Sequence, residues 1–291
     1  MRAVRGFLPL IVLPAVVILF APATWPPWAL MWTLAFAIYC GCKWLTWRRT
    51  PAPRASWALH LGYLAAWPGM DAPAFLNVRR RETLERVTLP EWLFAALKTA
   101  WGFVVLYGIA RLVPLDYPYV VGWVGMLGTA LILHFGGFHL LSCAWRSMGV
   151  QARPLMNWPL VSTSVSEYWG RRWNTAFRDM THRFLFRPLT PRLGAQWALL
   201  AGFTFSGIVH DLVISYPIGG GYGGPTVFFL LQAVGMLFER SPIGKRWKLG
   251  SGWRGWIFTG VVLLGPTLLL FHRPFVEGIV VPYMRAIGAI S

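Results

Sequence analysis

Two short polar signatures stand in apolar surroundings and could carry chemistry. The first is residues 169–174 (Trp-Gly-Arg-Arg-Trp-Asn), in a basic segment, and the second is residues 206–211 (Ser-Gly-Ile-Val-His-Asp), inside a hydrophobic run. Ionisable side chains are costly to bury in a membrane, so an intramembrane histidine and aspartate indicate a functional site. A histidine alone could equally be a structural hydrogen-bond partner. The adjacent carboxylate and the upstream Asn174 favour the functional interpretation of His210.

The helical surroundings of His210 leave room for a substrate. Gly207 and Ser206 lie three and four positions before it on the same helix face, and both are small. A substrate chain could approach the imidazole there. Asp211 points about 100° away around the helix and cannot readily orient His210 directly. We expect this carboxylate to pair with another helix or with a loop arginine.

Residues 169–184 have the pattern of an interfacial amphipathic helix. An apolar stripe faces the acyl region, with the polar side chains opposite or beside it; the stripe consists of Trp169, Trp173, Phe177, Met180 and Phe184. Three arginines of this segment, Arg171, Arg172 and Arg178, have two interpretations. They bind anionic lipid headgroups, or some of them hold the phosphates of a coenzyme A donor, because guanidinium groups match phosphate geometry.

The composition excludes a soluble domain. Hydrophobic residues make up 56% of the 291 residues and charged residues only 13%, whereas charged residues are about 25% of a soluble domain. The net charge of +17 lies in short loops between apolar runs, so nucleic acid is not an expected partner. Cys40, Cys42 and Cys143 have no metal-ligand spacing, and His134 and His139 do not share a helix face. We expect no metal and no cofactor.

The hydropathy pattern predicts one all-α membrane domain over residues 1–291, with about seven to nine transmembrane helices. The expected spans are 6–20, 29–45, 92–112, 119–143, 197–216, 226–238, 256–271 and 275–290. The first could be a cleaved signal peptide, but we favour a retained span. Residues 56–67 are too short and suit a re-entrant or interfacial helix. Basic loops, including Arg79 to Arg81, place the N-terminus in the cytoplasm.

These signatures resemble the wax synthase branch of the membrane-bound O-acyltransferases. The resemblance rests on four runs and their continuation to Glu239: residues 156–159, 166–174, 186–188 and 206–210. It covers a core over 156–239, and the earlier run 67–71 is also similar. The family's fold is an MBOAT-like bundle with re-entrant helices. Its members transfer a fatty acyl group from a thioester to an alcohol.

The resemblance implies a catalytic histidine at His210 and a second signature residue at Asn174. Trp173 and Ser206 belong to the same runs and are expected to support them. Plant wax synthases usually have glutamate after the histidine, whereas this chain has Asp211. That difference affects the expected acceptor preference and the role of this carboxylate.

The resulting hypothesis is direct acyl transfer from acyl-CoA to a long-chain alcohol, without an acyl-enzyme. Neutral His210 would act as general base, and Asn174 would position the donor or stabilise the oxyanion. Other acceptors stay open: a sterol, diacylglycerol, polyol or extracytoplasmic glycan. A lipid transporter or flippase and a catalytically inactive binding protein are alternatives from other classes. The expected location is a bacterial inner membrane.

The two signature residues are expected at different depths. Asn174 belongs to a segment on the cytoplasmic face, whereas His210 lies beyond the middle of an outward-running span. Asn174 and His210 can meet only if the segment that carries Asn174 enters the membrane or a lipid tunnel extends to that segment.

Overall fold

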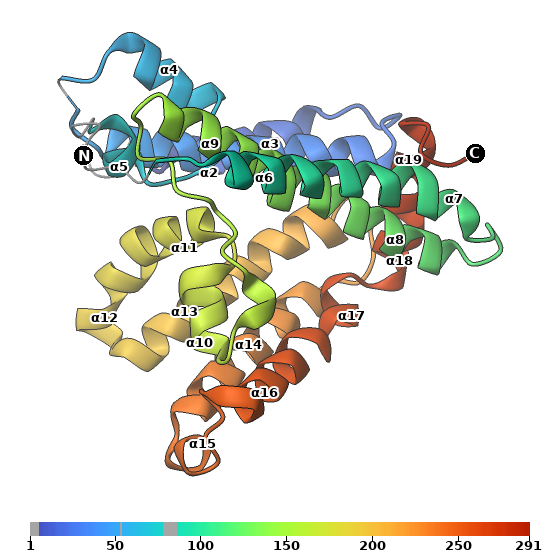
Figure 1. Ribbon diagram of the computed structural model, residues 1–291. Coiled ribbons are helices and arrows are strands. Elements are labelled where there is room, and N and C mark those ends of the chain that lie inside the picture. Colours follow the sequence, from blue (N-terminus) through green and yellow to red (C-terminus); the bar gives the residue numbers. More distant parts are fainter. Residues whose placement is uncertain (1–5, 53, 78–85) are drawn as a thin grey trace. The chain divides into compact units, whose positions relative to one another are not determined.

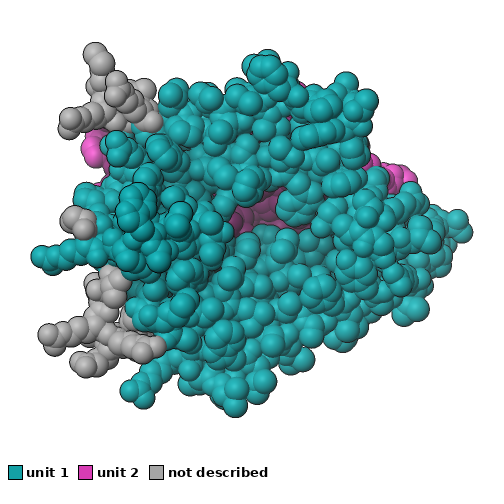
Figure 2. Space-filling view, turned by 90° about the horizontal axis from the view of Figure 1, so that it is seen from above, with its two compact units in different colours: residues 1–155, 279–291 teal, residues 156–278 magenta. Residues whose placement is uncertain are grey.

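The computed structural model describes residues 6–52, 54–77 and 86–291, and every regular element among them is a helix. The predicted all-α class is confirmed. The predicted orientation rests partly on arginines that lie outside the described residues: Arg2, Arg5 and Arg79 to Arg81. The chain divides into two compact units, residues 1–155 with 279–291 and residues 156–278 (Figure 2). The expectation of one functional membrane domain stays a prediction.

The first unit is built from long helical runs (Figure 1). Helices α2 (Leu8–Phe20) and α3 (Pro27–Arg48) form a hairpin, whose turn contains two prolines that cannot continue a helix. The shorter α4 (Trp57–Ala65) and α5 (Ala72–Leu76) follow.

Two composite helices complete the core of this unit. One consists of α6 (Leu89–Phe103), η2 (Val104–Ile109) and α7 (Ala110–Leu112), and the other of α8 (Pro118–Ala130), η3 (Leu131–Gly137) and α9 (Phe138–Ser147). They pack closely because glycines face the partner helix: a Cβ atom at Gly128 would lie 2.8 Å from the backbone N of Leu106. Helix α19 (Val281–Ala286) packs on α8.

The second unit begins with short helical turns. These are η4 (Pro159–Val161), α10 (Val165–Glu167), η5 (Tyr168–Arg172), α11 (Thr175–Thr181), η6 (His182–Phe186) and α12 (Arg187–Leu193). The hairpin of α13 (Ala195–His210), extended by η7 (Asp211–Ser215), and α14 (Gly224–Arg240) is the centre of this unit. After it come α15 (Pro242–Arg246), α16 (Gly252–Leu264), α17 (Thr267–Leu270), α18 (Arg273–Phe275) and η8 (Val276–Val280).

Five helical runs in the described part of the chain are long and apolar enough to cross a membrane. They are Pro27–Arg48, Leu89–Leu112, Pro118–Ser147, Ala195–Ser215 and Gly252–Leu270. The first three each contain a predicted span, and the last two end one residue before the predicted spans 197–216 and 256–271. The protein is therefore an integral membrane protein. The other predicted spans are shorter: α2 has 13 residues, α14 has 17, and residues 275–290 are divided among α18, η8 and α19.

The predicted continuous helix over residues 169–184 is wrong. Trp173 is extended, with φ −103° and ψ 127°, and Asn174 is left-handed, with φ 40° and ψ 61°. Asparagine adopts this conformation more readily than most residues. The segment therefore consists of η5 and α11, joined at a sharp corner that carries Asn174.

Candidate active site

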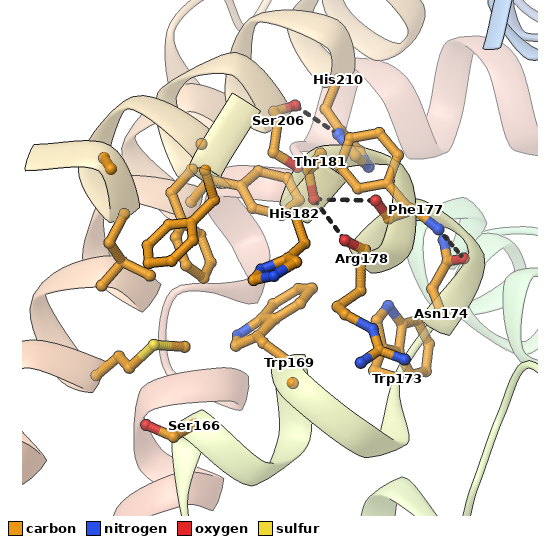
Figure 3. A pocket seen from close by; sticks show the side chains of 18 of the residues that line it. Ser166, Trp169, Trp173, Asn174, Phe177, Arg178, Thr181, His182, Ser206 and His210 are labelled. Atoms are coloured by element: carbon orange, nitrogen blue, oxygen red, sulfur yellow. Dashed lines mark hydrogen bonds between the residues drawn. The ribbon is translucent and has the colours of Figure 1, made fainter. Parts of the chain in front are cut away.

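A cavity of about 460 Å³ lies within the second unit and is lined by both signatures. Its walls come from η5, from α11 with η6, and from one face each of α13 and α14. In Figure 3, Ser166 lies at one end of the view and His210 at the other, with Trp169 between them. The corner residue Asn174 and the helix residue His210 line this one cavity. The two signatures therefore share one cavity, as the hypothesis requires.

The α13 wall is a line of small side chains that ends at His210. Ala198, Gly202 and Ser206 line the cavity at intervals of four residues, so they share one helix face with His210. The helix positions a histidine at the end of a groove that its own small residues leave open.

The protonation of His210 is fixed by its helix. Its Nδ1 lies 2.7 Å from the backbone oxygen of Ser206. A carbonyl oxygen only accepts, so Nδ1 carries the proton and donates it. The neutral ring therefore has an unprotonated Nε2, for which the described residues provide no hydrogen-bond partner. The ring also packs against Phe229, with centroids 4.5 Å apart. This is the tautomer that a general base using Nε2 requires.

Asp211 does not line the cavity; it closes the α13–α14 hairpin. Its carboxylate accepts hydrogen bonds from the backbone N–H groups of Gly223, at 2.8 Å, and Thr226, at 3.1 Å. The Ser215 hydroxyl donates to it at 3.0 Å. The expected partner from another helix is confirmed at the start of α14, where a carboxylate is also favoured by the helix dipole.

Asn174 serves as the N-cap of α11. Its Oδ1 accepts the backbone N–H of Phe177 at 3.3 Å, which satisfies one of the unpaired donors at a helix start. The cap occupies the oxygen and leaves the amide Nδ2 as the group available to a ligand. Trp173, beside it, also lines the cavity and stacks on Tyr168 with ring centroids 5.5 Å apart.

A buried carboxylate attaches the η5 wall to α14. Glu239 is 6% exposed and accepts the backbone N–H groups of Val165 and Ser166 at 2.7 and 2.9 Å. These are donors at the start of a helical segment that carries Trp169 and leads to Asn174. Glu239 therefore fixes the position of one cavity wall relative to another.

A second carboxylate, Glu167, forms an ion pair with one of the predicted phosphate-binding arginines. Arg172 pairs with it at 2.7 Å and also donates to the carbonyl oxygens of Asn157 and Trp158. Burial alone would raise the pKa of Glu167, but hydrogen bonds from Thr163 and Arg172 outweigh burial and hold that pKa below its usual value. Arg172 therefore has a structural role in the chain as it stands.

Of the three predicted donor-binding arginines, the cavity contains Arg178 alone. Arg171 is exposed, and neither it nor Arg172 is among the lining residues. Arg240 and His182 are the two exposed members of the lining. The Arg240 Nε donates to the Ser166 hydroxyl at 2.9 Å, which places a cation at the Ser166 end of the cavity.

Two aromatic walls and Arg240 were missed by sequence reasoning. Phe229 packs on His210, and Trp169 packs on Phe203 and Phe229 with centroids 5.8 and 5.6 Å apart. The helical periodicity predicts a lipid-facing Trp169, yet its indole N–H donates to the buried Gln232 at 3.4 Å. Residues 228–232 belong to the family resemblance, and an amide in this otherwise apolar run was the signal available.

A possible metal cluster occurs in the first unit, at Glu91, His139 and Cys143. Their ligand atoms lie within 4.8 Å of one another. However, Arg146 pairs with Glu91 at 2.5 Å, and the Lys98 ammonium lies 2.8 Å from His139 Nδ1. Metal-binding histidines usually donate their second ring nitrogen to an acceptor, which a charged lysine is not. Two nearby cations therefore disfavour a metal ion, and the absence of a metal stays a prediction.

Comparisons with known proteins support the family resemblance. A family model described as "Membrane bound O-acyl transferase family" matches residues 152–231. A probable long-chain-alcohol O-fatty-acyltransferase 8 of Arabidopsis thaliana is 29% identical over 43% of this chain and 40% of its own length. A long-chain-alcohol O-fatty-acyltransferase of Simmondsia chinensis is 30% identical over 34% of this chain and 32% of its own length.

A relative whose name specifies a different acceptor also matches. Acyl-CoA–sterol O-acyltransferase 1 of Arabidopsis thaliana is 30% identical over 26% of this chain and 24% of its own length. The resemblance to wax synthase-like membrane-bound O-acyltransferases is thus confirmed. The matches span less than half the length of these relatives. The activity, substrates and partners of this protein are therefore proposals.

Proposed function

We propose that this protein is a membrane-bound O-acyltransferase that transfers a fatty acyl group from acyl-CoA to a long-chain alcohol. The observation that carries the proposal is the fixed tautomer of His210. Its Nδ1 proton is held by Ser206, so Nε2 is a free base in a cavity shared with Asn174. The similarity to long-chain-alcohol O-fatty-acyltransferases supports the same reaction class.

In the proposed reaction His210 first accepts a proton and later donates the same proton. Nε2 removes the hydroxyl proton as the alcohol oxygen attacks the thioester carbonyl carbon. The Asn174 Nδ2 donates a hydrogen bond to the oxygen that becomes negative. Collapse of the tetrahedral intermediate breaks the carbon–sulfur bond, and the leaving thiolate takes the proton from Nε2. The products are a wax ester and free coenzyme A, and no acyl-enzyme is formed.

The charged end of the donor is proposed to bind at the Arg240 end of the cavity. Phe229, which packs on His210, lies eleven residues before Arg240 on α14, and this corresponds to about 17 Å of helix. The chain between the phosphate and the sulfur of coenzyme A has about thirteen bonds, and at roughly 1.2 Å per bond it extends about 16 Å. The two lengths agree.

The same end is proposed to face the cytoplasm. Lys245, Arg246, Lys248 and Arg254 follow α14 directly, and basic loops mark the cytoplasmic side. This orientation agrees with the predicted cytoplasmic N-terminus. The lipidic alcohol would enter from the bilayer. The bacterial inner membrane stays a prediction.

A sterol is the second candidate acceptor. The observation that favours it is the similarity to an acyl-CoA–sterol O-acyltransferase. The two reactions would use the same acyl donor and the same base. They would differ only in which alcohol fits the acceptor side of the cavity.

Product analysis with a variant of His210 tests the proposal. Membranes containing the wild type, His210→Ala or His134→Ala are given labelled acyl-CoA and a panel of long-chain alcohols and sterols. We expect His210→Ala to lower ester formation about 10²–10⁴-fold, the usual contribution of a general base. His134 lies on a different span, outside the cavity, and its variant should retain activity.

Equal ester formation by His210→Ala and the wild type would exclude His210 as the base. If the wild type forms no ester but lipid flux depends on the protein, the transporter alternative replaces this proposal.

A further inference from the structure

Two glycines on the cavity wall have no structural reason to be glycine. A Cβ atom added at Gly170 or at Gly202 would meet no atom within 4 Å. Neither has a positive φ, so neither backbone conformation requires the missing side chain. Gly207, on the same helix as Gly202, differs, because its Cβ would lie 2.5 Å from the Thr226 backbone. Gly207 is required by packing, whereas Gly170 and Gly202 leave space open.

The space that they leave open is the middle of the cavity. Both glycines line it. Gly202 lies eight residues before His210 on α13, or about 12 Å along the helix axis. Gly170 follows Trp169, whose ring packs on Phe203 and Phe229. The two glycines therefore border the route between the cation at Arg240 and the unpartnered Nε2 of His210.

We propose that Gly202 and Gly170 are specificity-determining residues, which keep this route wide enough for the pantetheine arm of a full-length coenzyme A thioester. The inference rests on the proposed function and adds the residues that set the width of the donor passage. A side chain at Gly202 would project into the passage and lean toward the N-terminus of α13, away from His210. It would obstruct the arm without touching the reacting groups.

A shortened donor separates this role from catalysis. In the palmitoyl thioester of N-acetylcysteamine, about five bonds follow the sulfur, which extend roughly 6 Å. That donor ends before the level of Gly202, whereas the arm of palmitoyl-CoA passes it. An obstruction at Gly202 should therefore discriminate between two donors that have the same acyl chain and the same reacting carbonyl.

The experiment compares kcat/KM for both donors in the full-length protein. The variants are Gly202→Ala, Gly202→Leu and Gly170→Leu, and the matched control is Gly260→Leu. Gly260 lies on α16, outside the cavity lining, and its added Cβ would also meet nothing within 4 Å. We expect Gly202→Leu to lower kcat/KM for palmitoyl-CoA at least about tenfold, mainly through KM, since filling a pocket by single methylene groups changes specificity about 10–200-fold.

Gly202→Ala should lower kcat/KM for palmitoyl-CoA less than Gly202→Leu does. Gly170→Leu should also lower this value. Activity of Gly202→Leu with the shortened donor should stay at the level of Gly260→Leu. An equal loss with both donors, or no loss with either, would overturn the inference. A loss confined to long acyl chains would also overturn it, because the acyl chain would then occupy this route. Absence of ester with the wild type would instead refute the proposed function.

Discussion

At the scale of single residues, Asn174 combines an observed structural role with a proposed catalytic role. Its oxygen caps α11, and its amide nitrogen faces no partner among the described residues. Its left-handed backbone sets the corner at which both roles become possible. A loss of activity in an alanine variant would therefore not distinguish an effect on folding from an effect on catalysis.

The variant Asn174→Asp separates the two roles. Aspartate caps helices as well as asparagine does and is among the residues that tolerate the left-handed conformation, so thermal stability should change little. The carboxylate has no N–H to donate to the developing oxyanion. We expect kcat to fall about 10²–10³-fold, the usual effect of losing one such donor. Stability and ester formation are measured on the same detergent-purified sample.

The donor role of Asn174 would be contradicted by an aspartate variant of full activity. Asn174→Gly provides the control, since it keeps the left-handed backbone but loses the whole side chain. It should lose activity to a similar extent.

The sequence identified two residues that the structure brings into one cavity, and their chemical roles stay predictions. His210 and Asn174 lie in short motifs, and a polar group in an apolar run is conspicuous because of its burial cost. Arg240 and Phe229 were not predictable as cavity residues. Their roles depend on the register between α13 and α14, which no local pattern in the chain encodes.

At the scale of elements, π-helical turns and one corner decide which side chains reach the cavity. Segments η5, η6 and η7 are π-helical and adjoin the site, where such turns commonly occur. Each one shifts the phase of the side chains that follow it. A uniform 100° per residue therefore placed Trp169 on a lipid-facing stripe and Arg172 beside a phosphate site. The structure turns Trp169 to the cavity and pairs Arg172 with Glu167.

The attachment of η5 to α14 by Glu239 leads to a stability prediction. In Glu239→Ala, the backbone N–H groups of Val165 and Ser166 lose their acceptor in a buried position. Hydrogen bonds to charged groups contribute about 1.5–3 kcal/mol each, so loss of both should lower the free energy of unfolding by about 3–6 kcal/mol. Thermal unfolding in detergent measures this change, and Glu239→Gln should lie between alanine and the wild type.

Glu277→Ala is the matched control for Glu239. Glu277 pairs with Arg273 at 2.9 Å, but the Arg273 side chain is 74% exposed, and exposed pairs contribute at most about 1 kcal/mol. Equal destabilisation by the two alanine variants would show that Glu239 does not anchor the cavity wall.

At the scale of the whole molecule, hydropathy predicted the long spans well. Each of the five long runs coincides with a predicted span to within a few residues, because about 20 apolar residues are an explicit signal. Residues 275–290 were less predictable: Pro282 and Arg285 interrupt the apolar run, and hydropathy does not show where helices break. The division into two compact units also has no composition change to mark it.

The proposed orientation predicts opposite accessibility at the two ends of the α13–α14 hairpin. Tyr222, in the connecting loop, is 63% exposed, and Lys245, after α14, is also exposed. In intact cells, a membrane-impermeant thiol reagent should label Tyr222→Cys but not Lys245→Cys. Permeabilisation should make both accessible. The unmodified protein serves as background, because Cys42 and Cys143 are buried and Cys40 is partly buried.

Labelling of Lys245→Cys without permeabilisation would show that the true orientation is the reverse of the proposed one. It would also contradict the proposed cytoplasmic entry of the donor, which shares the Arg240 end with this loop.

Asp211 closes the α13–α14 hairpin between His210 and the loop that connects the two helices. Gly219, Gly221 and Gly223 have positive φ, so this loop follows a path suited to glycine. The carboxylate joins the start of α14 to the residue next to His210 before the loop begins. We expect replacements between residues 216 and 220 to change the surface of this loop while the imidazole keeps its position. Gly221 is excluded, because its carbonyl oxygen accepts a hydrogen bond from Ser215, which also donates to Asp211. This arrangement would let the loop diversify in evolution independently of the reaction.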